Sequence, residues 1–168
     1  MELEALQPTL REKLAGTEAV YPTRVFDKAE TLRLGSEEIQ ILFFGGGHTP
    51  GDSVVWLPKS RTLFSGDLGF VDRLLGVLPF GNTKDWLASF AAIENLAPKA
   101  IVPGHGKVCD LSRARKDTRD YLVLLRTHMK QALDQGMDLQ TAISSLDQSA
   151  FKYLQHYELL SGGNASRT

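Results

Sequence analysis

Gly45-Gly46-Gly47-His48-Thr49-Pro50-Gly51-Asp52 is the stretch that decides the fold of this chain. An apolar run at residues 39–44 precedes it, and a second strand-like run at 53–57 follows it. Glycine allows positive φ and lets backbone segments approach one another closely, so a tight loop is expected between two strands. Two interpretations stay open at this point: a turn that contains a histidine, or a functional site built at the mouth of a sheet.

The composition is that of an ordinary globular domain. A length of 168 residues fits one domain, and 42% hydrophobic and 23% charged residues are normal values. A net charge of −1 gives no broad basic field, so neither nucleic acid nor an anionic membrane is expected as a partner. The single cysteine, Cys109, excludes an intrachain disulfide and a multi-thiolate zinc site. Any metal would therefore be held by imidazole and carboxylate groups.

No targeting signal is evident in the sequence. No apolar run approaches the length that spans a bilayer. The start, Met1-Glu2-Leu3-Glu4, is acidic, and no signal-peptide core follows it. The compartment is otherwise undetermined, so a cytoplasmic location is the default expectation.

The amino-terminal part predicts one helix followed by strands. Leu6, Leu10 and Leu14 recur every four residues and favour a leading helix. Residues 20–26 are rich in β-formers around a proline and indicate an irregular strand. Two hairpins follow, one pairing 30–34 with 38–44 and the other pairing 53–57 with 62–65.

The carboxyl-terminal part is mainly helical. The apolar segment 68–81 is either a packed loop or a substrate-facing lip, and it offers no polar group that identifies a substrate beyond some apolar character. Asn82 or Thr83 is expected to cap a helix that ends at Ala97, before a proline. The further expected elements are a short strand at 100–102, a helix at 111–135, a short helix after Asp138, a helix at 151–160, and an unstructured tail at 164–168.

These elements predict an α/β (α+β) fold with one mixed, mainly antiparallel sheet and helices on one face. The runs 39–44 and 54–57 are apolar at consecutive positions, so both faces of their strands want cover. The helices suffice for one face only. We therefore expect either pairing with a second copy or a layer that this chain does not supply.

Three candidate metal ligands, His48, Asp67 and His105, stand at strand ends, each directly after a glycine. Residues at the carboxyl ends of neighbouring strands converge on one crevice in α/β sheets. Two imidazoles and a carboxylate would suit zinc or another divalent metal such as iron. Each residue alone has an ordinary structural explanation, but their joint occurrence favours a site.

The motifs around these residues resemble the last three metal-binding motifs of the metallo-β-lactamase superfamily. The matching segments are Gly47-His48-Thr49-Pro50-Gly51-Asp52, Phe64-Ser65-Gly66-Asp67 and Val102-Pro103-Gly104-His105-Gly106. The resemblance implies that His48 is the third histidine of the first metal position and that His105 binds the second metal. It implies that Asp67 bridges both metals as the catalytic carboxylate. Asp52 resembles a second-shell residue, although an Asx cap of the turn explains it equally well.

The first motif of the family, His-x-His-x-Asp-His, does not occur in this sequence. The remaining histidines, His128 and His156, lie on predicted helices and are expected to be packing or surface residues. The chain thus resembles the C-terminal half of the family's αββα sandwich. We expect residues 1–168 to form one truncated domain, with a leading helix and strand at 1–29, a motif-bearing sheet at 30–110, a helical remainder at 111–163 and a tail at 164–168.

The resemblance implies a metal-dependent hydrolase in which a metal-activated water attacks an ester, thioester, lactam or similar bond of a small molecule. Zinc is the expected metal, with iron or manganese as alternatives, and a site that holds no metal in this chain is a further alternative. Three hypotheses stay open. They are a partial hydrolase with weak or no activity of its own, a self-associating half-domain that forms a homodimer, and a non-catalytic binding module with inherited ligands.

Overall fold

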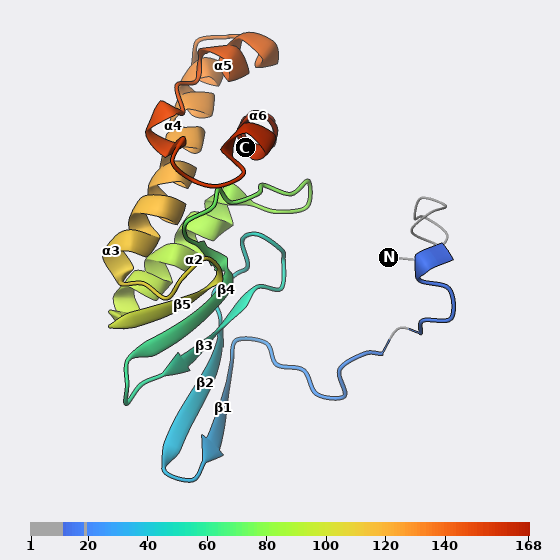
Figure 1. Ribbon diagram of the computed structural model, residues 1–168, viewed down its shortest axis with the longest axis vertical. Coiled ribbons are helices and arrows are strands. Elements are labelled where there is room, and N and C mark those ends of the chain that lie inside the picture. The colour runs from blue at the N-terminus through green and yellow to red at the C-terminus, as the bar shows by residue number, and fades with distance from the viewer. Residues whose placement is uncertain (1–11, 19) are drawn as a thin grey trace.

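One mixed sheet organises the chain in this computed structural model, which describes residues 12–18 and 20–168 (Figure 1). Its five strands lie in sequence order, β1-β2-β3-β4-β5. The first four pair antiparallel, and β5 runs parallel to β4. The strands are β1 (Ala29–Leu34), β2 (Glu37–Phe43), β3 (Ser53–Leu57), β4 (Thr62–Phe70) and β5 (Ala100–His105). The predicted mixed, mainly antiparallel sheet is confirmed.

Both predicted hairpins are present, and their turns have the expected chemistry. Gly35 joins β1 to β2 with a φ of 62°, a conformation that glycine adopts without strain. Arg61 ends the turn between β3 and β4 with a φ of 54°. The register places Ile41 opposite Val55 and places Trp56 opposite Leu63.

The helices lie on one face of the sheet, as predicted (Figure 1). Asn82 caps α2 by accepting hydrogen bonds from the backbone N–H groups of Lys84 and Asp85, and Ala97 ends that helix in the left-handed conformation. Asp138 caps α5 as expected. The helical elements are α2 (Thr83–Leu96), α3 (Leu111–Ala114), the π-helical turn η2 (Arg115–Arg119), α4 (Asp120–Asp134), α5 (Leu139–Ser145), the 3₁₀ turn η3 (Ser149–Phe151) and α6 (Tyr157–Ser166).

Of the two expected leading elements, the strand is not observed. The helix predicted through Leu6 and Leu10 falls mainly on residues outside those described, and residues 12–13, within its expected span, are helical. The strand predicted at 20–26 is wrong, because residues 20–28 form no strand. Val20 and Tyr21 are 93% and 79% exposed, so these β-formers have no neighbouring strand or core to order them.

The carboxyl-terminal end also differs from the prediction. The final helix was expected at 151–160, with Gly162-Gly163 as its end and a free tail after it. Instead α6 runs from Tyr157 through both glycines to Ser166. Asn164 is completely buried, and its side chain bonds the backbone N–H of Val77, so tertiary contacts override the helix-breaking tendency of glycine.

Two strands extend further than expected. β4 continues through Asp67 to Phe70, and β5 continues to His105. The register between the two strands shifts after Phe64 and again after Gly66. These irregularities allow β4 to continue toward the site although Gly66 interrupts its regular pairing. Two of the candidate ligands are therefore strand residues.

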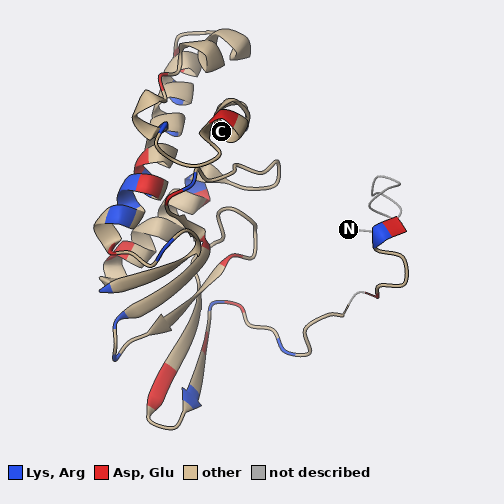
Figure 2. Cartoon of the chain, viewed as in Figure 1, with Lys and Arg blue, Asp and Glu red and all other residues tan. Residues whose placement is uncertain are grey.

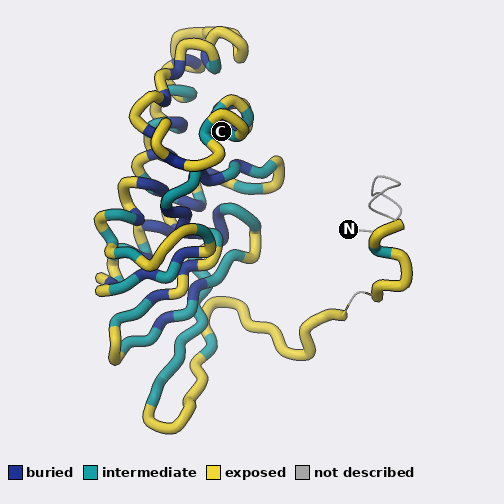
Figure 3. The backbone as a smooth tube through the Cα atoms, in the orientation of Figure 1, coloured by how far each residue is buried: buried dark blue, intermediate teal, exposed yellow. Residues whose placement is uncertain are grey.

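The hydrophobic core lies between the sheet and the helices, as the burial pattern in Figure 3 shows. Val54 and Leu63 point toward the helices and are fully buried, together with Trp86 of α2 at 1% exposure. The segment after β4 packs into the same core through Val71, Leu74, Leu75 and Val77. Its interpretation as a packed segment is therefore supported.

The opposite face of the sheet carries apolar side chains without a covering layer in the described part of the chain. Cross-strand partners share a face, so the register places Phe64 with Val55 and Ile41 on this side. Phe64 is 42% exposed, and Leu32 on the edge strand β1 is 40% exposed. We call this surface the open face; its apolar members are Leu32, Leu34, Ile39, Ile41, Phe43, Val55, Leu57, Phe64 and Val102.

Charged side chains gather on the helices and are of mixed sign (Figure 2). Glu94 of α2 forms an ion pair with Arg115 of η2 at 2.6 Å, which links these two helical elements. No helix in the described ranges is both long and apolar enough to cross a membrane.

Candidate metal centre

His48 is held by the glycine-rich loop between β2 and β3. Gly45 and Gly46 have φ values of 113° and 80°, which require glycine. At Gly47 a Cβ would lie 2.8 Å from side-chain atoms of Leu68 and Trp86, so the loop can pack there only without a side chain. The loop therefore places His48 directly over the end of the core.

Helix α2 anchors the same loop. The backbone N–H of Asn82 donates to the carbonyl of Gly47 at 2.9 Å, and the hydroxyl of Ser89 donates to the carbonyl of Gly46 at 2.6 Å. The Ser89 side chain is fully buried, so this contact is shielded from water. The histidine loop is thus attached to the helix layer as well as to the sheet.

Asp52 closes the turn that follows His48. Its carboxylate accepts hydrogen bonds from the backbone N–H of Thr49 at 2.7 Å and from the Thr49 hydroxyl at 2.6 Å. An Asx cap would accept from N–H groups that follow it, whereas Asp52 reaches back three residues and closes the turn from its far end. Nδ1 of His48 is buried and has no hydrogen-bond partner among the described residues, so Asp52 acts on the turn and does not contact the imidazole.

Asp67 and His105 meet because β4 and β5 are parallel neighbours. At Gly104 a Cβ would lie 2.7 Å from the backbone of Gly66, so the two strands approach closely where the site lies. The backbone N–H of Val71 donates to the carbonyl of His105 at 2.9 Å, which continues the contact beyond the ligands.

The structure brings the three predicted ligands to one place. Nε2 of His48 lies 3.8 Å from Oδ2 of Asp67, and Nε2 of His105 lies 3.5 Å from Oδ1 of Asp67. The side chain of His48 is 13% exposed, whereas those of Asp67 and His105 are 37% and 39% exposed. The group is therefore anchored on its His48 side and open to solvent on the other.

The group is not a closed metal site. Within residues 12–18 and 20–168, no three His, Cys, Asp or Glu side chains have the arrangement of a ready-made metal site. His48 and His105 each face Asp67, which links them. The remaining histidines lie elsewhere: Nε2 of His128 is 2.8 Å from the carbonyl oxygen of Ala142, and His156 precedes α6.

Aromatic rings form the floor below the ligands. The ring of Phe70 stacks on His105 with centroids 4.7 Å apart and is tilted against His48 at 5.4 Å. Trp86 meets His48 edge-on at 5.3 Å, and its indole N–H donates to the carbonyl of Leu68 at 3.0 Å. Burying these rings beside the imidazoles limits the positions that the imidazoles can take.

Arg73 is a site neighbour that sequence reasoning missed. Its Nη1 lies 3.3 Å from Nδ1 of His105, and its guanidinium carbon lies 5.8 Å from the centroid of Phe70. From the sequence, we expected no polar group in residues 68–81 that identifies a substrate, and we did not anticipate that one of them would contact a candidate ligand. The available signal was the pair Asp72-Arg73, the only charged residues in that apolar segment.

The comparison with known families agrees with this geometry. A family model described as "Metallo-beta-lactamase superfamily" matches residues 4–105. The chain belongs to the metallo-beta-lactamase superfamily. The match ends at His105, the last of the three candidate ligands.

Individual relatives are similar in sequence to this chain over part of their length. A metallo-beta-lactamase type 2 of Elizabethkingia meningoseptica is 32% identical over 84 residues, which are 48% of this chain and 34% of that protein. The "Acyl-coenzyme A thioesterase MBLAC2" of Gallus gallus is 23% identical over 107 residues, covering 61% of this chain and 38% of that protein. This chain therefore matches little more than a third of these curated relatives.

A solved structure supports the fold assignment. The metallo-beta-lactamase from Pontibacter korlensis superposes with a TM-score of 0.53 at 28% identity, over 61% of this chain and 50% of that one. This metallo-beta-lactamase superfamily chain thus has an α+β fold portion like that of a solved member.

The donor set fits a metal in kind, although it is incomplete. Ligand atoms of a tetrahedral zinc site are about 3.3 Å apart, because zinc–nitrogen bonds are about 2.0 Å long. The 3.5 and 3.8 Å separations around Asp67 are close to that spacing. Two imidazoles and one carboxylate leave at least one coordination position to be filled from elsewhere.

Proposed function

We propose that this chain forms the His48–Asp67–His105 side of a metal-dependent hydrolytic site. The substrate class is a small molecule with an ester, thioester, lactam or similar bond. The observation that supports the proposal is that the three predicted ligands meet at the ends of their strands, with the two Nε2 atoms 3.5 and 3.8 Å from opposite oxygens of Asp67. A thioesterase and β-lactamases among the relatives point to the same bond classes.

Zinc is the metal that we propose, with iron or manganese as alternatives, because borderline divalent ions accept mixed imidazole and carboxylate ligands. When bound, such an ion would supply a Lewis acid and lower the pKa of a coordinated water to about 7. His48 and His105 would hold it through Nε2. Asp67 is the catalytic carboxylate of the proposal, because its two oxygens face both imidazoles and solvent reaches it.

We further propose that the open face is covered in the working protein. Nine apolar residues lie on this face, and two of them, Phe64 on β4 and Leu32 on the edge strand β1, are 42% and 40% exposed. Exposed apolar patches of this kind mark interaction surfaces. The occupant would be either a segment with the His-x-His-x-Asp-His motif or a second copy of this chain. By itself the chain would show weak or no hydrolysis.

Metal titration tests the proposal. Calorimetry with Zn²⁺, Fe²⁺ and Mn²⁺ would compare the wild type with His48→Ala, Asp67→Asn and His105→Ala. Each substitution removes a ligand and is expected to weaken binding more than about tenfold. His156→Asn is the matched control, since it removes an imidazole away from the site and asparagine tolerates the positive φ of 61° there.

Two results would contradict the proposal. One is a wild type that takes up none of the three metals, which would favour the non-catalytic module. The other is a loss of affinity in His156→Asn equal to that in the ligand variants.

A further inference from the structure

The ring of Phe70 touches both imidazoles of the site. It stacks on His105 at an interplanar angle of 29° and a centroid distance of 4.7 Å. It also meets His48 at 5.4 Å, and it is only 2% exposed. A buried side chain between two others sets their separation, because packed interiors do not deform freely. Whatever holds Phe70 therefore influences the spacing of the two histidines.

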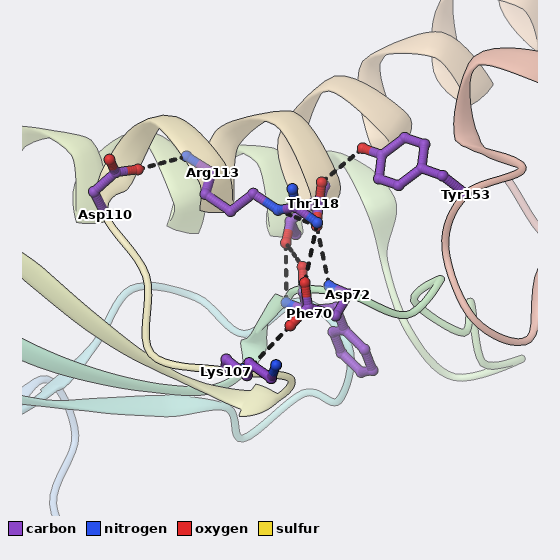
Figure 4. Close-up of polar contacts among 8 residues, drawn as sticks. Phe70, Asp72, Lys107, Asp110, Arg113, Thr118 and Tyr153 are labelled. Carbon is purple, nitrogen blue, oxygen red and sulfur yellow. Dashed lines mark hydrogen bonds and ion pairs between the residues drawn. The ribbon is translucent and has the colours of Figure 1, made fainter.

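Thr118 holds the backbone of Phe70 at the end of β4. Its hydroxyl accepts from the N–H of Phe70 at 2.9 Å and donates to the carbonyl of Phe70 at 2.6 Å (Figure 4). Thr118 is fully buried, so both bonds lie away from water. A residue far along the chain thus takes the place of a neighbouring strand at the point where β4 ends.

Asp117, the neighbour of Thr118, holds the chain just beyond. Its carboxylate is fully buried and accepts from the N–H of Asp72 at 3.0 Å, Nε of Arg113 at 2.8 Å and the hydroxyl of Tyr153 at 2.7 Å. Burial and then the bond to Asp117 raise the pKa of Tyr153, so this phenol stays protonated and donates. The network also reaches the residues just after β5, because Asp72 accepts from the N–H of Lys107 at 3.2 Å (Figure 4).

Both residues belong to η2 (Arg115–Arg119), the π-helical turn inside the long helix. Such turns are rare and occur often at functional sites. Here neighbouring side chains of the turn reach the end of β4 and the segment after it: Thr118 bonds Phe70 and Asp117 bonds Asp72. The turn is therefore joined to the end of β4 and, through Asp72, to the residues after β5, without a hydrogen bond to any of the three candidate ligands.

We propose that η2 is the positioning element of this centre, with Thr118 as the positioning residue that sets the separation of His48 and His105 through the ring of Phe70. Asp117 secures the same segment through Asp72 and Lys107. The predicted loss of metal affinity on changing Thr118 rests on the proposed function. The predicted change in the positions of the His48 and His105 imidazoles does not.

The test measures the imidazoles in the metal-free protein. The chain has four histidines, so its imidazole C–H signals can be assigned by NMR. Thr118→Val keeps the shape of the side chain and removes the hydroxyl. It should shift the signals of His48 and His105, which feel the Phe70 ring, and leave those of His128 and His156 in place. Thr118→Ser keeps the hydroxyl and should restore the wild-type positions.

Asn164→Ala is the matched control. Asn164 is equally buried and likewise bonds backbone groups of a loop, accepting from Val77 N–H and donating to the carbonyl of Leu75, both at 2.7 Å. It should lower stability without shifting the signals of His48 or His105. Asp72→Gly is a second variant, since glycine fits the φ of 64° there. This variant should shift the NMR signals of His105 more than those of His48. It can replace Thr118→Val in the test if that variant does not fold.

Zinc titration adds the functional readout. Thr118→Val should weaken binding about tenfold, the lower end of what is lost with groups that orient ligands. The inference is overturned if Thr118→Val, or Asp72→Gly in its place, leaves the His48 and His105 signals unchanged, or if Asn164→Ala shifts them equally. A wild type that binds no metal would refute the proposed function, while the NMR comparison would still decide this inference.

Discussion

The two faces of the sheet carry similarly apolar side chains, but one face is buried and the other is exposed. Leu63 and Phe64 are neighbours on β4, yet Leu63 is fully buried against the helices and Phe64 is 42% exposed on the open face. Both residues are apolar, so hydrophobicity alone does not tell which face is covered. The difference shows that the helices of this chain cover one face of the sheet only. The site therefore lies at the end of a sheet that has one covered and one uncovered face.

The largest effect should come from breaking the covered face. Leu63→Ala is expected to cost about 2–5 kcal/mol of unfolding free energy, because it leaves a cavity in the core. Phe64→Ala on the next position should cost less than about 1 kcal/mol, since its side chain is already partly solvated. Urea unfolding of the two variants measures the difference. Equal losses would mean that the open face is packed in solution.

A smaller effect should follow from making the open face polar. If a second copy covers this face, Phe64→Glu should weaken self-association at least about tenfold, since burying an unpaired carboxylate is costly. Leu133→Glu is the control, because Leu133 on α4 is 76% exposed and lies outside the open face. Analytical ultracentrifugation over a concentration series provides the measurement. A monomeric wild type would favour a separate segment as the occupant, and equal effects of both variants would refute the face as the contact.

The smallest effect concerns the border of the covered core. Cys109 bonds the backbone of Ile101, and burial followed by the charges of Asp110, Asp117 and Asp72 raises the pKa of its thiol to about 11. Alkylation by iodoacetamide should therefore be slow at pH 8 in the native protein and rise as the pH approaches about 11.

The sign for stability follows from the same shift. The pKa of the Cys109 thiol is higher in the folded state than its ordinary value of 9.0. The contribution of the neutral thiol to the free energy of unfolding is therefore fully present below pH 9 and is lost as the pH rises toward 11. Urea-unfolded protein should react faster at pH 8, and Cys109→Ser provides the blank. A native rate equal to the unfolded rate would show that this edge of the core is open.

Much of the fold was predictable because local signals agreed. Asn82 and Asp138 carry cap chemistry, Gly35 marks a hairpin, and alternating residues mark β1. Where local signals misled, a tertiary contact was the reason. Gly162-Gly163 favours a helix end, yet α6 continues because Asn164 is buried against the loop at Leu75 and Val77.

The site divides in the same way. His48, Asp67 and His105 were predicted as ligands from glycine-flanked positions at strand ends and from their motifs, and this stays a prediction, whereas the family assignment is confirmed. Arg73, Phe70 and Thr118 were not identified. Their importance depends on distances to residues far away in sequence, which no periodic pattern encodes.

The sequence by itself indicated the five strands, the caps, the motifs around His48, Asp67 and His105 and the family, since each signal comes from residues within a few positions of one another. It also suggested a strand at 20–26 that does not form. Only the tertiary structure decided that opposite oxygens of Asp67 face two imidazoles, that η2 supports Phe70, and that one face stays open. These features arise from the parallel pairing of β4 with β5 and from packing of helices on one side. Such contacts join segments whose spacing along the chain carries no signal of their meeting.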